Sequence, residues 1–154
     1  MTVYQLPENS KIVLTLVNNR RKDMIHFQKY SSLVGRIFIS LIFLVAGLSK
    51  IGGYDATQAY MQAMGVNEQL LILVIITEVL GAIAIIIGYK TRLAAFLLAG
   101  FSILAAILFH ADFSNQMQSI LFMKNIAISG GLLLIVSHGA GYLSVDNWLA
   151  KKQR

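Results

Sequence analysis

Residues 70–89, LLILVIITEVLGAIAIIIGY, decide the fold, because they form a long apolar run with a single charged side chain, Glu78. A helix of about 17–25 apolar residues is long enough to cross a bilayer. Strands seldom reach this length without a turn signal, and lipid offers the backbone no hydrogen-bond partner, so a helix is the expected structure. The run therefore predicts a membrane-spanning helix with a carboxylate inside it.

Three further apolar runs approach the same length, at residues 33–49, 93–109 and 119–136. Together with the first run they predict an all-α fold, a bundle of four transmembrane helices. The composition agrees, because 56% of the 154 residues are hydrophobic and 13% are charged, whereas a soluble domain has about 25% charged residues. A chain this short cannot hide so much apolar surface from water, so a water-soluble monomer is not expected.

The chain has no cysteine and three histidines. It therefore lacks the thiolates that hold structural zinc, cysteine-ligated iron–sulfur clusters and c-type haem. Ligation of a haem by two histidines would need His110 and His138, which the predicted spans place on opposite sides of a hydrocarbon core about 30 Å thick. We expect no metal site, and neither haem, an iron–sulfur cluster nor zinc.

Lysine and arginine gather in three segments on one side of the predicted membrane, whereas the loops on the other side carry Asp55, Glu68 and Asp112. The positive-inside rule therefore predicts a multi-pass protein with both termini in the cytoplasm. The same bias accounts for the net charge of +6, so no nucleic-acid partner is expected. The basic residues of the three segments are Lys11, Arg20, Arg21, Lys22, Lys29, Arg36, Lys90, Arg92, Lys151, Lys152 and Arg154.

This distribution divides the chain into three predicted parts. Residues 1–31 are a basic juxtamembrane N-terminal arm in the cytoplasm, partly helical and resting in part on anionic headgroups. Residues 32–146 are the four-helix membrane domain, and residues 147–154 are a cytoplasmic basic tail.

Two short helices are expected outside the spans. Asp55 is placed to cap a helix over residues 56–64 that ends at Gly65 and lies across the bundle as a lid. Ser144 is placed to cap a second helix, whose Trp148 suits the headgroup region.

Ionisable side chains within the spans are expected to face the bundle interior, because lipid cannot accommodate them. Arg36 is predicted to lie near the cytoplasmic surface with Arg92, apart from the others. Asn125 lies beside the last of a group of four that fall in the opposite half of the bundle. That group, one residue from each span, is Lys50, Glu78, His110 and Lys124.

Two interpretations of this group stay open. In the first, Glu78 is a buried anion neutralised by Lys50 or Lys124, and the group only fixes the packing of the helices. In the second, the group lines a pocket for a small polar or quinone-like ligand, whose oxygens a carboxylate, an imidazole and an ammonium could hydrogen-bond. A buried ion pair adds little stability compared with apolar packing, which leaves room for the second interpretation. Aromatic side chains that could cover such a ligand are Phe43, Tyr54 and Phe109.

Several short motifs follow one another between residues 33 and 146. They are Gly35-Arg36, FLVAGLSK at 43–50, Tyr60-Met61, Met64-Gly65, Glu78-x-x-Gly81, GYKTR at 88–92, His110, FMKN at 122–125, Gly130-Gly131 and GYLSVD at 141–146. Their order and spacing resemble the DoxX family of small four-helix membrane proteins. The resemblance implies a bacterial inner (plasma) membrane protein, and it places the family's polar positions on the candidate residues named above and on Arg92.

The family is named from a subunit of a terminal quinol oxidase and is similar to subunits of thiosulfate:quinone oxidoreductase. The resemblance therefore implies an accessory or quinone-interacting subunit of a membrane redox system, with quinone as the ligand. Its partners would be the lipid bilayer and another membrane or peripheral oxidoreductase subunit, and it could form an oligomer. A non-catalytic scaffold or assembly protein is the alternative hypothesis, and a small transporter is the third. No catalytic residue is assigned.

Overall fold

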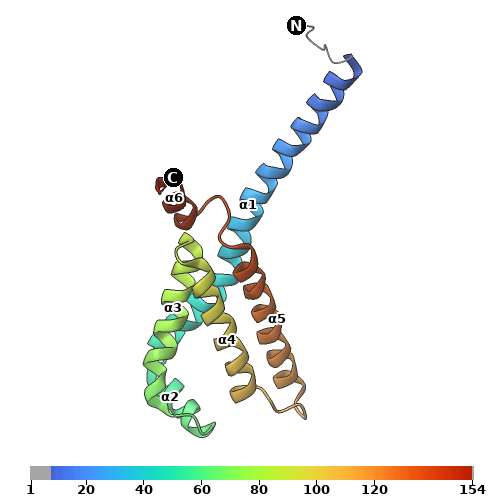
Figure 1. Ribbon diagram of the computed structural model, residues 1–154. Coiled ribbons are helices and arrows are strands. Elements are labelled where there is room, and N and C mark those ends of the chain that lie inside the picture. Colours follow the sequence, from blue (N-terminus) through green and yellow to red (C-terminus); the bar gives the residue numbers. More distant parts are fainter. Residues whose placement is uncertain (1–7, 154) are drawn as a thin grey trace.

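The computed structural model describes residues 8–153, with side chains from residue 16 onward, and every regular element in that range is helical (Figure 1). The predicted all-α fold is therefore confirmed. Residues 1–7 of the predicted arm and Arg154 of the predicted tail lie outside this range. The elements are α1 (Glu8–Gly52), α2 (Tyr54–Ala63), the short 3-10 helix η1 (Glu68–Leu70), α3 (Leu71–Ile87), α4 (Thr91–Phe109), α5 (Gln116–His138) and α6 (Val145–Lys152).

Within residues 8–153, four stretches of helix are long and apolar enough to cross a membrane, and each overlaps one of the four predicted spans. Their outer faces carry large apolar side chains such as Leu73, Phe96 and Leu134, which are 60%, 60% and 63% exposed. Such a surface suits lipid rather than water. The four stretches are Leu16–Gly52, Glu68–Ile87, Thr91–Phe109 and Gln116–His138.

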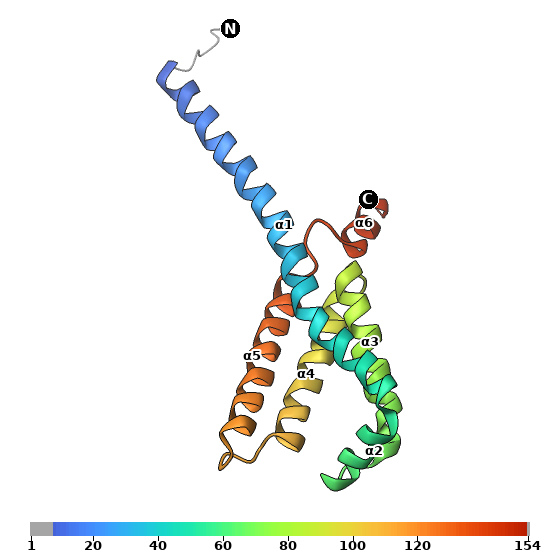
Figure 2. The ribbon, with the colours of Figure 1, turned by 180° about the vertical axis from the view of Figure 1, so that it is seen from behind.

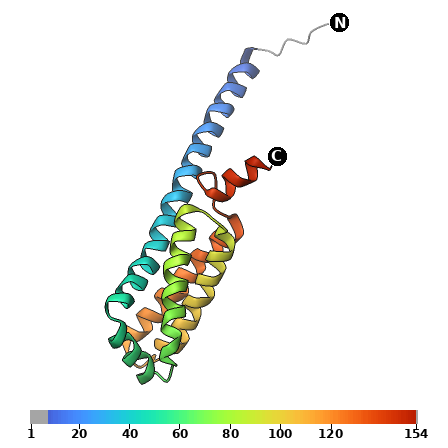
Figure 3. The ribbon, with the colours of Figure 1, turned by 90° about the vertical axis from the view of Figure 1, so that its left-hand side faces the viewer.

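The bundle consists of two antiparallel pairs of helices. In one pair α1 packs on α3, in the other α4 packs on α5, and the contact between α3 and α4 joins the pairs. The central core lies where the pairs meet, with Ala82, Ile85, Leu98 and Leu132 inaccessible to solvent. The start of α1 and the short helix α6 lie at one end, which we call the terminal end (Figure 3). The far end is formed by α2 and the connection between α4 and α5 (Figure 1).

The first helix is much longer than a membrane span. At 1.5 Å per residue, its 45 residues extend about 68 Å, and its first half projects past the terminal end of the bundle (Figure 2). From residue 8 the predicted arm is helical and continues into the first span without a break at residues 31 and 32. A separate arm that contacts lipid headgroups stays a prediction.

Of the two predicted helix caps outside the spans, the structure confirms one and contradicts the other. Ser144 caps α6 as predicted, because its side chain accepts a hydrogen bond from the amide of Asn147. The prediction that Asp55 caps α2 is wrong. The N-cap is Gly53, since the amide of Thr57 already donates to the carbonyl of Gly53 and the chain re-enters a helix directly after α1. Asp55 lies in the first turn instead, where its charge still favours the helix dipole.

Arg36 joins three segments at the terminal end. Its side chain is 1% exposed, and its guanidinium donates to the carbonyl of Ile85 at 3.1 Å and to the carbonyl of Leu143. Arg36 is therefore bound to the end of α3 and to the segment before α6. It lies at the same end as Arg92 and apart from the far-end group, as the sequence predicts, but its guanidinium is buried and bound to carbonyl groups. The buried carbonyls at a helix end need donors, and Arg36 supplies them.

Asp146 completes this contact from α6. Its carboxylate accepts from the amides of Lys90 and Thr91 at 2.8 and 3.0 Å and from the Thr91 hydroxyl at 2.8 Å, and its amide donates to the Gly88 carbonyl. Burial by itself raises the pKa of Asp146, but these hydrogen bonds and the charge of Arg36 outweigh it and hold the pKa below its ordinary value. We call Arg36, Gly88, Thr91 and Asp146 the terminal clamp.

The lowered pKa of Asp146 predicts acid sensitivity of the terminal clamp. A carboxylate with a folded-state pKa below the unfolded value of about 3.9 stabilises the fold fully above that value and loses this contribution as the pH falls through the folded-state pKa. Asp146→Asn removes the contribution at every pH. We therefore expect the thermal midpoints of the wild type and the variant in detergent to differ at about pH 7 and to converge toward about pH 3. A difference that is constant with pH would contradict the assignment.

Gly88 offers a second test of the terminal clamp, because it follows the last residue of α3 in a left-handed conformation with φ of +75°. A Cβ at this position would collide with the Arg36 guanidinium and with Ser144. We expect Gly88→Ala to lower the free energy of unfolding by at least about 1–2 kcal/mol, the cost of the left-handed conformation alone. Gly100→Ala in α4 is the control, because a Cβ there meets nothing within 4 Å. Alanine is favoured in helices, so equal losses in the two variants would contradict the assignment.

Candidate functional site

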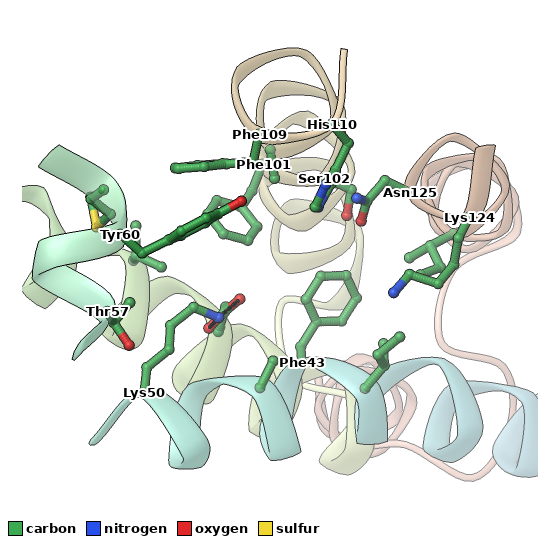
Figure 4. A pocket seen from close by; sticks show the side chains of 17 residues that line it. Phe43, Lys50, Thr57, Tyr60, Phe101, Ser102, Phe109, His110, Lys124 and Asn125 are labelled. Carbon is green, nitrogen blue, oxygen red and sulfur yellow. Dashed lines mark hydrogen bonds and ion pairs between the residues drawn. The ribbon is translucent and has the colours of Figure 1, made fainter. Parts of the chain in front are cut away.

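A pocket of about 260 Å³ lies at the far end, between the two helix pairs and under α2. Figure 4 shows Lys50 and Tyr60 on one side of it, and Lys124 and Asn125 on the other. Aromatic rings from α1 and α4 contribute apolar walls. The polar residues that line the pocket are Lys50, Thr57, Glu78, Ser102, His110, Lys124 and Asn125, and the aromatic residues are Phe43, Tyr60, Phe101 and Phe109.

An ion pair between α1 and α3 forms one wall. The Lys50 ammonium lies 2.8 Å from each carboxylate oxygen of Glu78, which is 4% exposed. Gly47, one turn earlier, permits this contact, because a Cβ there would meet Val79 Cγ2 at 2.7 Å and the Glu78 Cβ at 3.3 Å. Of the two cations that the sequence left open as partners of Glu78, the structure pairs it with Lys50.

The opposite wall belongs to α5. Lys124 and Asn125 line the pocket from this helix, and the Lys124 side chain is exposed (Figure 4). Among the described residues, the contact between Lys50 and Glu78 is the one ion pair, so Lys124 has no carboxylate partner there. Lys124 thus adds a second positive charge at the pocket without neutralising the carboxylate.

His110 closes α4 and is held by a residue that the sequence analysis missed. Its Nδ1 lies 2.7 Å from Oε1 of Gln118, in the first turn of α5. This hydrogen bond holds the imidazole ring at the end of α4 and leaves its Nε2 without a partner in this contact. The short connection between the third and fourth spans was the signal that could have pointed to Gln118.

Ser102 and Tyr60 also line the pocket, although the sequence analysis did not count them among the candidate site residues. The Ser102 side chain is 1% exposed, and its hydroxyl has no hydrogen-bond partner in the protein. Tyr60 of α2 stacks on Phe109 of α4, with 5.7 Å between ring centroids and an interplanar angle of 24°. Tyr54, which the sequence analysis expected to cover a ligand, does not line the pocket. Tyr60, further along the same helix, lines the pocket instead.

The structure therefore brings together five of the six candidate residues, Lys50, Glu78, His110, Lys124 and Asn125, and places Arg36 in the terminal clamp. Within residues 8–153, no group of three or more histidine, aspartate or glutamate side chains is arranged to hold a metal ion.

The helical bundle and this buried ion pair define a small multi-pass membrane protein of the α-helical class. The chain belongs to the DoxX family, whose model matches residues 31–111, so the resemblance seen in the sequence is confirmed. It is 48% identical over 120 residues to inner membrane protein YqjF of Escherichia coli (strain K12). The aligned region covers 78% of this chain and 92% of that relative. It is 34% identical over 121 residues to inner membrane protein YphA of the same strain, with 74% and 86% covered. No solved structure matches the chain.

The ion pair predicts an asymmetric response to substitution. Lys50→Met leaves a buried carboxylate without its cation, so we expect a loss of about 3 kcal/mol, at the low end for a buried pair because the Lys50 side chain stays 26% exposed. The double variant Lys50→Met/Glu78→Gln should recover most of this loss, because no uncompensated charge remains. The measurement is the free energy of unfolding in detergent.

Lys124→Met is the matched control for this series. It removes the same charge and fills the same pocket, but it leaves the Lys50–Glu78 contact in place, so we expect a change within about 0.5 kcal/mol. A loss for Lys124→Met that equals the loss for Lys50→Met would show that both cations neutralise Glu78, contrary to the geometry.

Proposed function

We propose that the far-end pocket binds the ring of a membrane quinone, and that the protein is an accessory, quinone-interacting subunit of a membrane redox system. The observation that carries the proposal is the combination of aromatic walls with the unpartnered, buried hydroxyl of Ser102. A buried hydroxyl without a partner costs free energy, and a ligand oxygen in the pocket would remove that cost.

The polar groups of the pocket match the chemistry of a quinone ring. Ser102 can donate to one carbonyl oxygen of the ring, and the ammonium groups of Lys50 and Lys124 can donate to another. When the ring is reduced, its oxygens take up protons, and Glu78 and His110 are groups that can supply or accept them. Phe43 and Phe109 would cover the faces of the ring, as aromatic side chains commonly do.

The size of the pocket restricts the ligand. Its volume of about 260 Å³ lies below the roughly 300–1,000 Å³ of most ligand pockets, so it suits a quinone head of one or two rings rather than a larger polycyclic compound. A long apolar tail would leave the pocket toward lipid. Because the chain has no cysteine, we propose that a partner oxidoreductase subunit supplies or receives the electrons.

We also propose that the terminal end faces the cytoplasm and the far end the periplasm. Lys90, Arg92, Lys151 and Lys152 lie at the terminal end, whereas Asp55 and Asp112 lie at the far end. This charge distribution supports the orientation by the positive-inside rule. The pocket would then open near the periplasmic surface of the membrane.

A scaffold or assembly protein is the second candidate, and one observation favours it. Lys50 contacts both oxygens of Glu78, so the most buried charge in the pocket is already compensated within the protein. In that case the pair serves to hold α1 on α3, and no ligand is required. The two candidates differ in whether the folded protein responds to quinone.

The quinone proposal predicts ligand-dependent stabilisation. We expect a short-tailed ubiquinone or menaquinone analogue to raise the thermal midpoint of the purified protein in detergent, because a ligand that binds only the folded state stabilises it by mass action. Ser102→Ala and Glu78→Gln should reduce this rise to less than half, each measured against the variant without ligand.

Asp55→Asn is the control, because it also replaces a carboxylate by an amide at the far end but lies outside the pocket. It should keep the full response. If none of several benzoquinones and naphthoquinones raises the midpoint of the wild type, the scaffold function is favoured and the quinone proposal fails. An equal rise in all variants would place quinone binding elsewhere on the protein.

A further inference from the structure

A second concave region lies at the terminal end, where the start of α4, the end of α5 and the start of α6 meet. It has a volume of about 650 Å³ and is open to the surface. Figure 1 shows α6 beside the start of α4, where the terminal clamp holds it. Among the residues that line this region are Lys90, Arg92, His138, Gly139 and Asp146.

The charge of this region is positive. Lys90 and Arg92 line it together with one carboxylate, that of Asp146, which accepts hydrogen bonds from Lys90 and Thr91 and lies close enough to Arg36 to feel its charge. Arg92 lies along the backbone of α5's end, since a Cβ on Gly139 would meet its Nε at 3.3 Å. Among the described residues, neither Lys90 nor Arg92 forms an ion pair with a carboxylate. Two cations therefore remain for an anionic ligand.

An apolar groove begins at the same place and runs along the outside of the bundle between α3 and α4. It has a volume of about 320 Å³, and Lys90 and Leu93 line both the groove and the cationic region. From Ile76 to Ala84 the groove follows α3 for about 12 Å, and it continues past the end of this helix to Tyr89 and Lys90. One leaflet of the hydrocarbon core is about 15 Å thick, so the groove has the length of an acyl chain within one leaflet.

Aromatic residues indicate that the cationic region lies at the depth of lipid headgroups. Tyr89, Tyr142 and Trp148 are 42%, 51% and 61% exposed at the terminal end, and tyrosine and tryptophan are enriched at the membrane–water boundary. Each ring also has a lysine ammonium over it at 5.3–5.8 Å, an arrangement in which the cation is kept near the headgroups.

We propose that this composite surface binds an anionic glycerophospholipid, with its phosphate at Lys90 and Arg92 and one acyl chain in the groove between α3 and α4. Charge complementarity selects the headgroup, and the continuity of the cationic region with the groove selects a lipid over a free anion. The site is distinct from the far-end pocket and does not rest on the function proposed for that pocket.

The backbone of Lys90 is a further observation at this site. Lys90 has φ of +43°, and it is the non-glycine residue with positive φ in the described range. Glycine or asparagine would adopt this conformation at lower cost. Lysine disfavours this left-handed conformation, yet it occupies the position and lines the site with its side chain. Strained backbone of this kind clusters at functional positions. Lys90→Gly therefore removes the charge and relieves the backbone together.

The test compares lipids that share their acyl chains. Full-length protein, purified and delipidated in detergent, is mixed with dioleoyl phosphatidylglycerol, with dioleoyl phosphatidylcholine or with glycerol 3-phosphate, and bound lipid is quantified by native mass spectrometry. We expect a clear preference for phosphatidylglycerol. In the variant Lys90→Gly/Arg92→Gln, the ratio of bound phosphatidylglycerol to bound phosphatidylcholine should fall by about 25-fold, because each basic side chain contributes roughly 5-fold at an anionic surface. The Lys90→Gly substitution should not lower the thermal midpoint of the protein without lipid.

Two controls separate a built site from diffuse attraction. Lys151→Gln/Lys152→Gln removes the same charge from α6 at the same end but outside the site, and it should keep the preference within about 2-fold; an equal loss in both double variants overturns the proposal. Ala84→Leu narrows the groove without changing charge and should weaken binding of phosphatidylglycerol. If glycerol 3-phosphate competes as well as the whole lipid does, the groove plays no part and the lipid assignment is overturned.

Discussion

Lipid surrounds this protein and can neither hydrogen-bond its polar groups nor compensate its charges, and the structure depends on that constraint. Each charged side chain must therefore lie at an end of the bundle or find its partner inside. Arg36 and Glu78 are the two charged residues that are almost completely buried in the described range. Each is placed where two helices or segments meet, Arg36 with carbonyl groups and Glu78 with Lys50.

The two ends of the bundle meet this constraint in different ways. At the terminal end the side chains of Arg36 and Asp146 bind backbone groups, and the Thr91 hydroxyl donates to the Asp146 carboxylate. These contacts close the connection between α3 and α4 and fix α6 against it. At the far end the two helix pairs leave a space between them, and Ser102 keeps an unpartnered hydroxyl within it. The terminal end thus uses most of its polar groups within the protein, although Arg36 Nε has no partner, whereas the far end keeps a hydroxyl beside an open pocket.

Glycine at the contact between helices connects the packing to the pocket. Because Gly47 has no side chain, α1 approaches α3 closely, and Lys50 then reaches both oxygens of Glu78. The remaining pairs of helices are held by apolar contacts and by one buried hydrogen bond from Ser129 to the carbonyl of Ala99. The pocket therefore lies between the two helix pairs, because α1 approaches α3 closely at Gly47 while the two pairs stay apart at the far end.

The sequence by itself determined the all-α fold, the four spans, the membership of the DoxX family and the residues that lipid would exclude. These follow from run length, composition and motif order, which are properties of neighbouring residues in the chain. Only the tertiary structure decided that Lys50 rather than Lys124 pairs with Glu78, that Arg36 binds carbonyl groups, and that Gln118 holds His110. Those contacts depend on how closely helices approach and where each helix begins, as at Gly47 and Gly53. Such distances are set by side chains from different helices packing together, which the pattern along one helix does not specify.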